Sequence, residues 1–442
     1  MTVTRHPFPA NNAAEHRPPI PAPIITTWWS PCGAACEADG AVRSPPFETK
    51  IIDLYTASVQ FIGHMADQFS RSGAAAPSSW KIRWVAQRNR ILGSPAFQNW
   101  TSRFWPMSLV ARYKARQAFD LVAGFTYSQT LLACVECGLL DLLATGPCDL
   151  PKIAEHTELS HDAALRLVKA AAAIDLAQEV SSDCWMLGKQ GAALHANEGA
   201  IAMVRHHRLL YRDLTDPLAL LRADRKQETA LSQFWHYASE PDGEKASEYS
   251  QLMATSQAMV CEQVLGAYDF AQHVSLLDIG GGHGRFVSGV AEAHPALRLG
   301  IFDLPPVLKG TASRLAQQGL AGRVSLHAGD FFHSPIPAGY DCVSLVRILH
   351  DHDDEQAVHL LTEIRKALPP GGRLIIAEPM ADTPGAKGMG DAYFGLYLWA
   401  MNSGRPRSAK EISKMLRAAG FARSGQVRTR QPLLCSVIVS FL

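Results

Sequence analysis

Apolar and polar residues change their spacing along this 442-residue chain. From about Val274, short apolar runs alternate with helical patterns. Five runs have the composition of strands: VSLLDIG, LRLGIFDLP, RVSLHAGD, DCVSLVRIL and GRLIIAEP. A sixth, LLCSVIVSFL, follows near residue 440. Strands that alternate with helices in this way favour an α/β fold with a doubly wound parallel sheet.

Residues 115–200, upstream of the predicted sheet, are rich in alanine and leucine and are predicted to be helical. The segment LPKIAEHTELSHDAALRLVKAAAAIDLAQEV predicts a helix, a turn and a second helix, and a wing-like stretch ending in CWMLG follows. A DNA-binding winged helix presents Arg, Asn or Gln to bases and Lys to phosphates. Here the second helix offers only Arg166 and Lys169 among alanines. Packing or dimer formation is therefore favoured over nucleic-acid binding.

The N-terminal part has another composition. Residues 1–48 are rich in Pro, Ala and Gly and are predicted to be disordered, and a helical pattern follows over 48–69. Residues 77–119 contain no acid; their basic residues and tryptophans are Lys81, Arg83, Arg88, Arg90, Arg103, Arg112, Lys114, Arg116, Trp80, Trp84, Trp100 and Trp105. We assign residues 49–110 to a basic, Trp-rich helical segment. The acid-free stretch 77–119 is either a basic helical face that lies on the rest of the protein or a patch that binds a membrane surface.

The composition narrows the cellular setting. A formal charge of +1 gives no overall case for a nucleic-acid partner, and nine cysteines without a visible leader suggest reduced thiols in the cytoplasm. The uncharged apolar run from Leu121 to Val135 has 15 residues and is expected to fall short of a membrane span. Cys134 and Cys137, like Cys32 and Cys36, are expected to be structural rather than redox or zinc sites.

A glycine-rich loop follows the first predicted strand of the sheet. LLDIGGGHG places Asp278, Gly280, Gly282 and Gly284 before the helix RFVSGVAEAH. Glycines allow a tight turn there and let a ligand approach the bare backbone beside a helix N-terminus. The spacing G-x-G-x-G differs from the dinucleotide pattern G-x-G-x-x-G because Arg285 occupies the last position, and there is no GK[ST] of an NTP loop.

Acidic residues end the next two predicted strands. Asp303 in FDLPP suits a ribose with its two hydroxyls, and Asp330 with Phe331 in HAGDFF offers an acceptor and an apolar wall for a purine. Taken singly, these residues are better explained in structural terms: Asp303 as a helix cap, Asp330 as a turn residue and the glycines as a plain turn. At the carboxyl ends of successive strands, they together predict an adenosyl pocket.

These motifs carry a family resemblance. DIGGGHG, FDLPPV, GDFF, RILHDHDDE and LPPGGRLIIAEP resemble the S-adenosylmethionine-dependent small-molecule O-methyltransferases over about residues 110–442. The resemblance implies a Rossmann-like methyltransferase domain over 266–442, a winged-helix dimerisation domain over 111–265, S-adenosyl-L-methionine as cofactor and a homodimer. No metal is implied.

The resemblance also assigns roles. His350 matches the histidine of the family's HD motif, which implies the general base, and a neutral imidazole suits that role at pH 7. Glu378 in IIAEP matches the carboxylate that orients this imidazole, and a solvated strand end is its alternative. Arg347 matches an arginine of related enzymes and is expected to face the cofactor.

The acidic stretch after His350 has two interpretations. Asp353 with Gln356 fits a capping box at the start of the helix EQAVHLLTEIRKAL, where acids are favoured. A metal site formed by His350, His352 and Asp354 is the alternative.

Three positions depart from the family. Pro406 stands in GRPRS where a second Glu is frequent, Val346 replaces a frequent Lys, and His283 replaces the usual Thr or Ser. These departures leave methyl transfer in place but put the detailed cofactor contacts in question.

The acceptor is predicted from further segments. FDLVAGFTYSQTLL, AMVRHHRLLYRDLTDPLALLR, YSQLMATSQ and YLWAMNSGRPRSAKEI resemble carotenoid O-methyltransferases of purple bacteria. They imply a lipophilic hydroxylated carotenoid as acceptor and a cytoplasmic enzyme peripheral to the photosynthetic membrane. Residues 391–404, which include Tyr393, Phe394, Tyr397 and Trp399, either wall a polyene channel or form helix core. A phenolic, hydroxyindole or tetrapyrrole acceptor and a non-enzymatic regulator are the alternatives.

Overall fold

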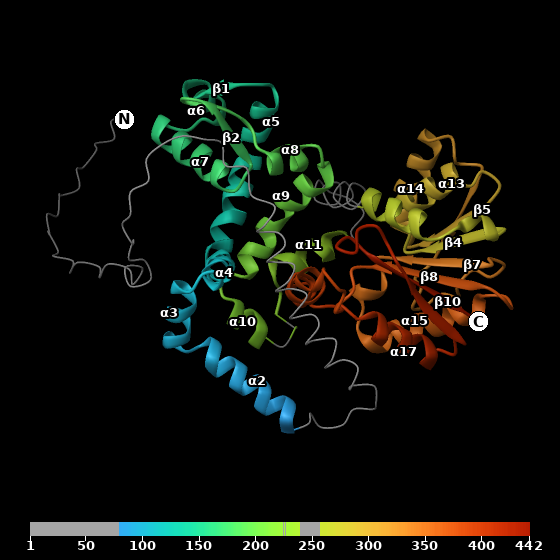
Figure 1. The fold of residues 1–442 in the computed structure, drawn as a ribbon. Coiled ribbons are helices and arrows are strands. Elements are labelled where there is room, and N and C mark those ends of the chain that lie inside the picture. Colours follow the sequence, from blue (N-terminus) through green and yellow to red (C-terminus); the bar gives the residue numbers. More distant parts are fainter. Residues whose placement is uncertain (1–78, 224, 226, 239–256) are drawn as a thin grey trace, which may run out of the picture. The chain divides into compact units, whose positions relative to one another are not determined.

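The computed structural model describes residues 79–223, 225, 227–238 and 257–442 (Figure 1). The chain divides into two compact units, one up to Ala118 and one from Phe119 to Leu442. The predicted disordered extension (1–48) and the helical pattern over 48–69 lie outside the described residues. The domain boundaries predicted at residues 110 and 265 stay predictions.

The first unit contains the basic segment. It comprises α2 (Ser79–Leu92), α3 (Pro95–Arg103) and the first turns of α4 (Met107–Glu136). Pro95 lies in the first turn of α3, where its missing N–H costs no helical hydrogen bond. None of the residues of α2 is buried.

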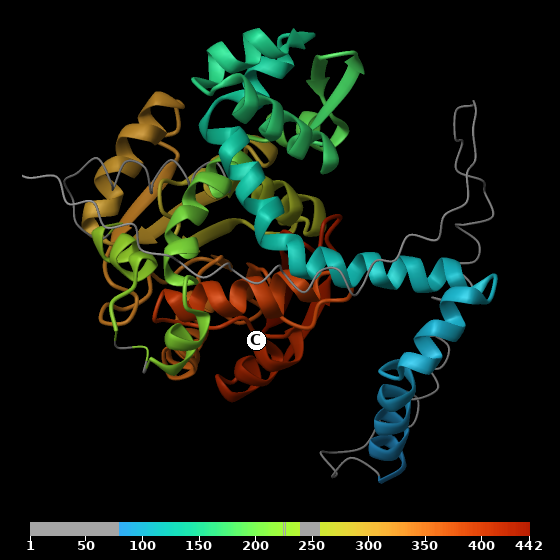
Figure 2. The ribbon, with the colours of Figure 1, turned by 90° about the vertical axis from the view of Figure 1, so that its left-hand side faces the viewer.

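Helix α4 can be followed in Figure 2, and it corrects one expectation. The apolar run Leu121–Val135 was expected to be too short for a membrane span, but the helix that contains it has 30 residues. By length and composition alone, α4 is the one helix among the described residues that suffices to cross a membrane, and 17% of its apolar window is buried. Cys134 lies on this helix and Cys137 follows directly after its end; both are free thiols, and burial raises the pKa of Cys134 to about 12.

A winged-helix lobe follows α4, as the sequence predicts. Its three strands have the order β1-β3-β2, with antiparallel pairing. The lobe consists of α5 (Leu139–Ala144), β1 (Cys148–Asp149), α6 (Leu150–Thr157), α7 (His161–Ala173), β2 (Ala177–Ser181), β3 (Cys184–Leu187) and α8 (Lys189–His195). Asp149 and Ser160 accept hydrogen bonds from the first-turn N–H groups of α6 and α7, which fixes the start of each helix.

Further helices connect this lobe to the sheet. They are α9 (Glu198–Asp213), α10 (Pro217–Arg222), α11 (Ala230–Ala238), a helix over 257–267 and the short η2 (Phe270–Gln272).

The sheet has seven strands in the order β6-β5-β4-β7-β8-β10-β9. The six predicted strands are present as β4 (Ser275–Ile279), β5 (Arg298–Asp303), β6 (Val324–Ala328), β7 (Cys342–Val346), β8 (Arg373–Glu378) and β10 (Ser436–Phe441). β4 to β8 are parallel, and β10 is antiparallel to both β8 and β9. The pattern missed β9 (Arg423–Val427), because its residues are largely polar and half-exposed.

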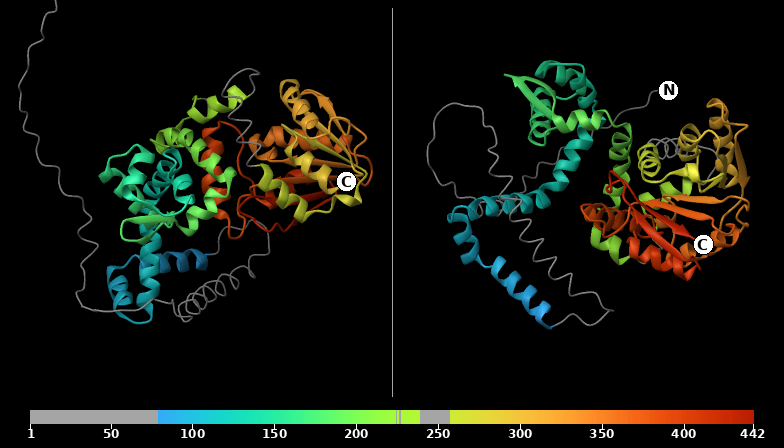
Figure 3. Two further views of the ribbon diagram at one scale, coloured as in Figure 1. Left: turned by 90° about the horizontal axis from the view of Figure 1, so that it is seen from above. Right: turned by 45° about the vertical axis from the view of Figure 1, so that its right-hand side comes forward.

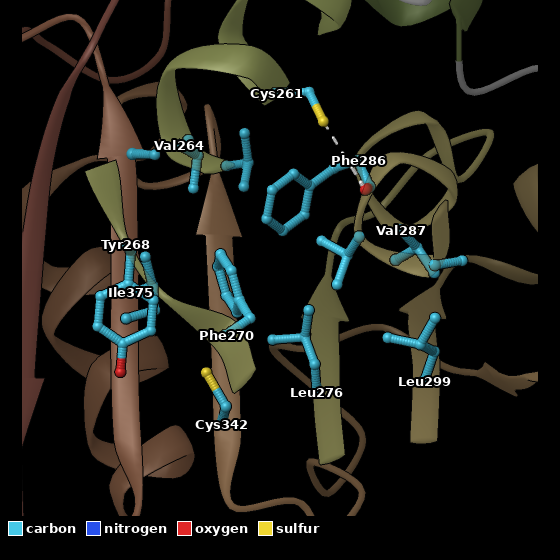
Figure 4. Close-up of a cluster of buried hydrophobic side chains, with 14 of the residues drawn as sticks. Cys261, Val264, Tyr268, Phe270, Leu276, Phe286, Val287, Leu299, Cys342 and Ile375 are labelled. Atoms are coloured by element: carbon cyan, nitrogen blue, oxygen red, sulfur yellow. Dashed lines mark hydrogen bonds between the residues drawn. The ribbon is translucent and has the colours of Figure 1, made fainter. Parts of the chain in front are cut away.

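Helices cover both faces of the sheet (Figures 1 and 3). One core is formed with α13 (Arg285–Ala293), α14 (Pro305–Gln317) and 257–267, and the other with α15 (Asp354–Ala367) and α17 (Ala409–Ala418). In the first core, Phe270 and Phe286 pack edge to face, with ring centroids 6.0 Å apart, above Leu276 of β4 (Figure 4). This packing holds η2 and α13 against one face of the sheet.

Candidate active site

The glycine loop adopts the backbone that its composition predicts. Gly280, Gly282 and Gly284 have φ values of 66°, 53° and 74°, in the left-handed region. A Cβ atom at Gly280 would lie 2.5 Å from Ile348 Cδ1, whereas one at Gly282 would meet nothing within 4 Å. Gly282, three residues before the start of α13, therefore leaves open space beside the loop that a ligand can approach.

Asp303 joins this loop to the end of β5. Its Oδ2 accepts the N–H of Gly282 at 2.7 Å, and its Oδ1 accepts the N–H of Leu304 at 2.7 Å. Burial raises the pKa of this carboxyl, and the two N–H donors act against that rise. Each oxygen keeps a second lone pair, so the carboxylate can still accept two hydroxyl groups.

Asp278 lies beneath the same loop. Its Oδ1 accepts a hydrogen bond of 2.6 Å from Ser344 Oγ, while its buried Oδ2 has no hydrogen-bond partner among the described residues. Burial raises its pKa to about 7. An orphaned carboxyl oxygen below a glycine loop fits a ligand with polar hydrogen atoms.

Asp330 behaves as a turn residue in this structure. Its Oδ1 accepts the N–H of Phe332 at 2.9 Å, and its Oδ2 lies 2.7 Å from His333 Nδ1. Phe331 packs edge to face on His352, with ring centroids 5.5 Å apart. The loop thus places Phe331 beside the segment that carries His350.

His350 lies in η3 (Leu349–Asp351), directly beyond the carboxyl end of β7, and is 2% exposed. Its main-chain N–H donates to Glu378 Oε2 at 3.0 Å. Its Nε2 lies 3.3 Å from Asp351 Oδ1, and its buried Nδ1 has no partner among the described residues. One ring nitrogen therefore faces the Asp351 carboxyl group, while the other is buried and has no partner among the described residues.

Burial controls the charges around this imidazole. It lowers the pKa of His350 to about 3, and the guanidinium groups of Arg347 and Arg407 act in the same direction. Burial raises the pKa of Asp351 to about 7 and that of Glu378 to about 8. Arg347 has a φ of 59° and is held by a hydrogen bond of 2.8 Å from its N–H to Ala377 O.

The carboxylate in contact with the imidazole differs from the expected one. Glu378 was expected to orient the ring, but it accepts the main-chain N–H of His350 instead. The side chain beside Nε2 is Asp351, which the sequence interpretation did not single out. The second residue of the HD dipeptide was the available signal.

The capping box predicted at Asp353 is wrong. Asp353 is the N-cap residue of α15 but makes no side-chain cap hydrogen bond. Its Oδ1 instead accepts the N–H of Gly404 at 3.1 Å and lies 3.2 Å from Arg225 Nη1. The carboxylate therefore binds a distant loop rather than its own helix.

The distant loop is the segment 403–407, which we call the clamp. Arg407 is fully buried and donates to Leu349 O at 2.8 Å, to His352 O at 2.6 Å and to Asp354 Oδ1 at 2.8 Å. The main-chain N–H of Arg405 donates to His350 O at 3.0 Å. The clamp thus holds the main chain at His350 and on both sides of it.

This arrangement bears on the metal alternative. Asp354 is paired with Arg405 at 3.0 Å as well as with Arg407, and His352 packs between Phe331 and Phe332. Two of the three proposed ligands are therefore directed at guanidinium or aromatic groups, a poor environment for a cation. No cluster of metal-ligating side chains occurs among the described residues.

The aromatic segment 391–404 contributes to the core, as one of its two interpretations predicts, and the polyene channel stays a prediction. Tyr397 of α16 (Phe394–Ala400) is buried, and its hydroxyl lies 2.7 Å from His206 Nε2 on α9. Tyr393, in η4 (Gly388–Tyr393), makes the same contact with His207 at 2.7 Å. Phe394 faces the His350 ring, with centroids 5.6 Å apart. Tyr397 is therefore core, and Phe394 forms a wall beside the imidazole.

Comparisons with known proteins point to one enzyme family. A family model described as an O-methyltransferase domain matches residues 211–422. The chain is 43% identical over 336 residues to demethylspheroidene O-methyltransferase of Rhodobacter capsulatus, which covers 75% of this chain and 83% of that protein. The enzyme of the same name from Cereibacter sphaeroides is 39% identical over 355 residues, covering 79% and 93%.

Solved structures give the same fold. Mitomycin 7-O-methyltransferase superposes with a TM-score of 0.63 at 25% identity, over 75% of this chain and 99% of that one. A methyltransferase of calicheamicin biosynthesis, in its SAH-bound form, has a TM-score of 0.62 at 26% identity, over 74% and 98%. The doubly wound sheet and the winged-helix lobe thus recur together in these proteins.

Proposed function

The chain belongs to the S-adenosylmethionine-dependent O-methyltransferases, and from this premise we propose that it methylates a hydroxyl group of a hydroxylated carotenoid. The observation that carries the proposal is the 43% identity to demethylspheroidene O-methyltransferase over 336 residues. The buried imidazole of His350, whose Nδ1 has no partner among the described residues, supports it independently.

The residues at the carboxyl edge of the sheet fit the cofactor. Gly282 leaves open space beside the loop, Asp303 has spare acceptor capacity for ribose hydroxyls, and Asp278 Oδ2 lacks a partner among the described residues. In our proposal these groups hold S-adenosylmethionine, together with Gly280, Gly284, Asp330, Phe331 and Arg347. The bound cofactor supplies an electrophilic methyl group on a sulfonium sulfur.

His350 is the proposed general base. Its pKa is lowered to about 3, so the imidazole is neutral and its Nδ1 can accept the hydroxyl proton as the acceptor oxygen becomes nucleophilic. Asp351, 3.3 Å from Nε2, then faces the imidazolium that forms and stabilises its charge. Glu378 acts through the main chain, because its carboxylate fixes the N–H of His350.

Positioning contributes most of the rate in this proposal. A tertiary carotenoid hydroxyl is a very weak acid, and an imidazole of low pKa is a weak base. The chain therefore has to hold the hydroxyl close to both the base and the methyl group, an effect that reaches many orders of magnitude in well-oriented reactions. The Phe394 ring beside His350 provides an apolar wall suited to a polyene end group.

One experiment tests the acceptor. Purified enzyme is incubated with methyl-labelled cofactor and, separately, with a hydroxylated carotenoid in neutral detergent, a phenol, a hydroxyindole and a hydroxylated tetrapyrrole, and products are identified by mass spectrometry. We expect a gain of one labelled methyl per modified hydroxyl on the carotenoid. If only one of the other acceptors is methylated, the enzyme acts on that class of substrate and the carotenoid proposal is overturned.

We also propose a homodimer, formed through the exposed apolar part of α4. Phe119, Leu121, Val122 and Phe125 are 63%, 86%, 74% and 73% exposed. A contiguous apolar patch on a helix usually marks an interface. The proposed location is cytoplasmic and peripheral to a membrane, where a lipophilic acceptor resides.

A further inference from the structure

We propose that α2, α3 and the start of α4 form a docking surface for the anionic head groups of a lipid bilayer. The surface consists of residues 79–118, which we call the basic platform. Its occupant is a membrane leaflet that contains acidic phospholipid. The proposal goes beyond methyl transfer, because it concerns how the protein reaches a lipid surface.

Three of the five large apolar side chains exposed on α2 form a stripe. Trp80, Trp84 and Ile91 follow the spacing i, i+4, i+11, which places them on one face of a helix with 3.6 residues per turn. Their exposed fractions are 54%, 46% and 42%. An exposed tryptophan stripe needs a partner that is apolar inside and polar outside, and the boundary between head groups and acyl chains has this character.

Basic side chains flank the stripe on both sides. By the same helical spacing, Arg83 and Arg90 lie along one edge of the stripe, and Lys81 and Arg88 lie along the other. Arg88 also covers the Trp84 ring, with its guanidinium carbon 5.3 Å from the ring centroid. Cations on both borders of an aromatic stripe match the phosphate layer on both sides of an inserted helix.

The platform continues beyond α2 with the same chemistry. The Trp100 and Phe104 rings stack with centroids 5.3 Å apart and are 53% and 50% exposed, and Trp105 is 70% exposed. Arg112, Lys114 and Arg116 follow on α4.

The charge of the platform selects the kind of partner. Residues 77–119 contain no Asp or Glu, and no basic side chain of the platform forms an ion pair with a residue that the structure describes. A second copy of the same surface would repel it. An anionic leaflet attracts each cation and releases its own counterions, so this is the partner that the charges fit.

The test uses the full chain and vesicles of phosphatidylcholine with or without about 30% phosphatidylglycerol. We expect co-sedimentation with the anionic vesicles at 50 mM KCl, loss of binding at 500 mM KCl and little binding to the neutral vesicles. Tryptophan emission should shift to shorter wavelength on binding. Neither cofactor nor acceptor is present, so the result is independent of the proposed methyl transfer.

Two matched variants assign the binding to the platform. Lys81→Gln with Arg88→Gln removes one Lys and one Arg seven positions apart on α2. Lys410→Gln with Arg417→Gln removes the same pair at the same spacing on α17, where both side chains are exposed. Each cation near an anionic leaflet contributes about a fivefold factor, so the first variant should bind about 25-fold more weakly. The α17 variant should bind like the unsubstituted protein.

A third variant tests the stripe. Trp80→Ala with Trp84→Ala should also weaken vesicle binding and reduce the emission shift. Helix content, measured by circular dichroism, should be unchanged in all three variants and serves as the check on folding. The proposal is overturned if the full chain does not bind anionic vesicles at low salt, or if the α2 and α17 variants bind them equally. It is also overturned if the platform binds duplex DNA more tightly than vesicles.

Discussion

The main-chain N–H of His350 donates to Glu378 Oε2 at 3.0 Å, while the His350 imidazole lies against Asp351. The two carboxylates therefore act on different parts of one residue. Glu378 fixes where the backbone of η3 lies, and Asp351 faces the ring that exchanges the proton. Removing either should affect catalysis in a different way.

Replacing the base should separate binding from chemistry. His350→Gln should keep cofactor affinity while turnover falls by about 10²–10⁴-fold, because a general base acts only when the hydroxyl proton leaves. Calorimetry with the cofactor and single-turnover methylation measure the two effects. His359→Gln, an exposed histidine on α15, is the matched control. Full turnover in His350→Gln would refute the base assignment, and activity lost to a chelator and restored by one divalent ion would favour the metal alternative.

The pH dependence should report Asp351 rather than His350. The pKa of His350 is lowered to about 3, so the imidazole is neutral throughout the working range. The pKa of Asp351 is raised to about 7, so its ionised form is present above that pH and is lost as the pH falls. We expect kcat to fall on the acid side of about pH 7. In Asp351→Asn, kcat should be lower and flat between about pH 5.5 and 8. If kcat of Asp351→Asn still falls below about pH 7, the titration of another group causes the fall. Glu378→Gln is then the next variant to measure.

Cofactor affinity should depend on Asp303. Asp303→Ala removes the acceptor for the ribose hydroxyls and leaves the Gly282 N–H without its partner at 2.7 Å. Hydrogen bonds to a charged group contribute about 1.5–3 kcal/mol, so Kd should rise about tenfold or more. Calorimetry measures this Kd for the cofactor. Asp162→Ala, on the exposed first turn of α7, should bind normally. Normal affinity in a folded Asp303→Ala protein would place the ribose elsewhere.

The clamp should matter for both stability and turnover. In Arg407→Lys, the ammonium group lacks the planar fork with which the guanidinium bonds to Leu349 O, His352 O and Asp354. Each buried carbonyl left unpaired costs about 1–3 kcal/mol of stability. We expect a lower Tm and a lower kcat with KM for the cofactor nearly unchanged. Arg405→Lys, whose side chain is 42% exposed, should show a smaller effect. Equal effects of the two substitutions would contradict a special role for the buried guanidinium.

The proposed dimer can be tested at α4. Leu121→Glu places a charge on the most exposed residue of the apolar patch, and it should convert the dimer to a monomer because a charge in an apolar interface is strongly unfavourable. Light scattering after size exclusion measures the mass. Gln117→Glu, an exposed polar position one turn away, should leave the dimer intact. A monomeric unsubstituted protein in neutral detergent would contradict the proposal.

The strands and the glycine loop were predictable from sequence, whereas side-chain partners were not. Buried parallel strands such as β4 and β7 are continuous apolar runs, so their positions follow from composition. β9 was missed because an edge strand of polar residues has no such run.

The errors around His350 have one physical origin. Asp353 was predicted to cap its own helix, because capping depends on local spacing. In the structure its partners are Gly404, 51 positions away, and Arg225, 128 positions away. Local propensity describes what a carboxylate does within its own helix turn, whereas groups distant in sequence, Gly404 and Arg225 for Asp353 and Arg407 for Asp354, decide the partners here.

Helix α16 and the clamp both contact His350, so a change in the shape of α16 is expected to affect both the choice of acceptor and the turnover rate. Phe394 of α16 contacts the His350 ring, and four residues after α16 ends, Gly404 reaches the backbone of His350 so closely that a Cβ atom there would lie 2.0 Å from His350 O. The wall at Phe394 and the proposed base are consequently held in one packed unit. A lineage that reshapes α16 to admit a different acceptor also shifts the group that removes its proton, so new acceptor ranges in this scaffold are expected to arise together with altered turnover rather than independently of it.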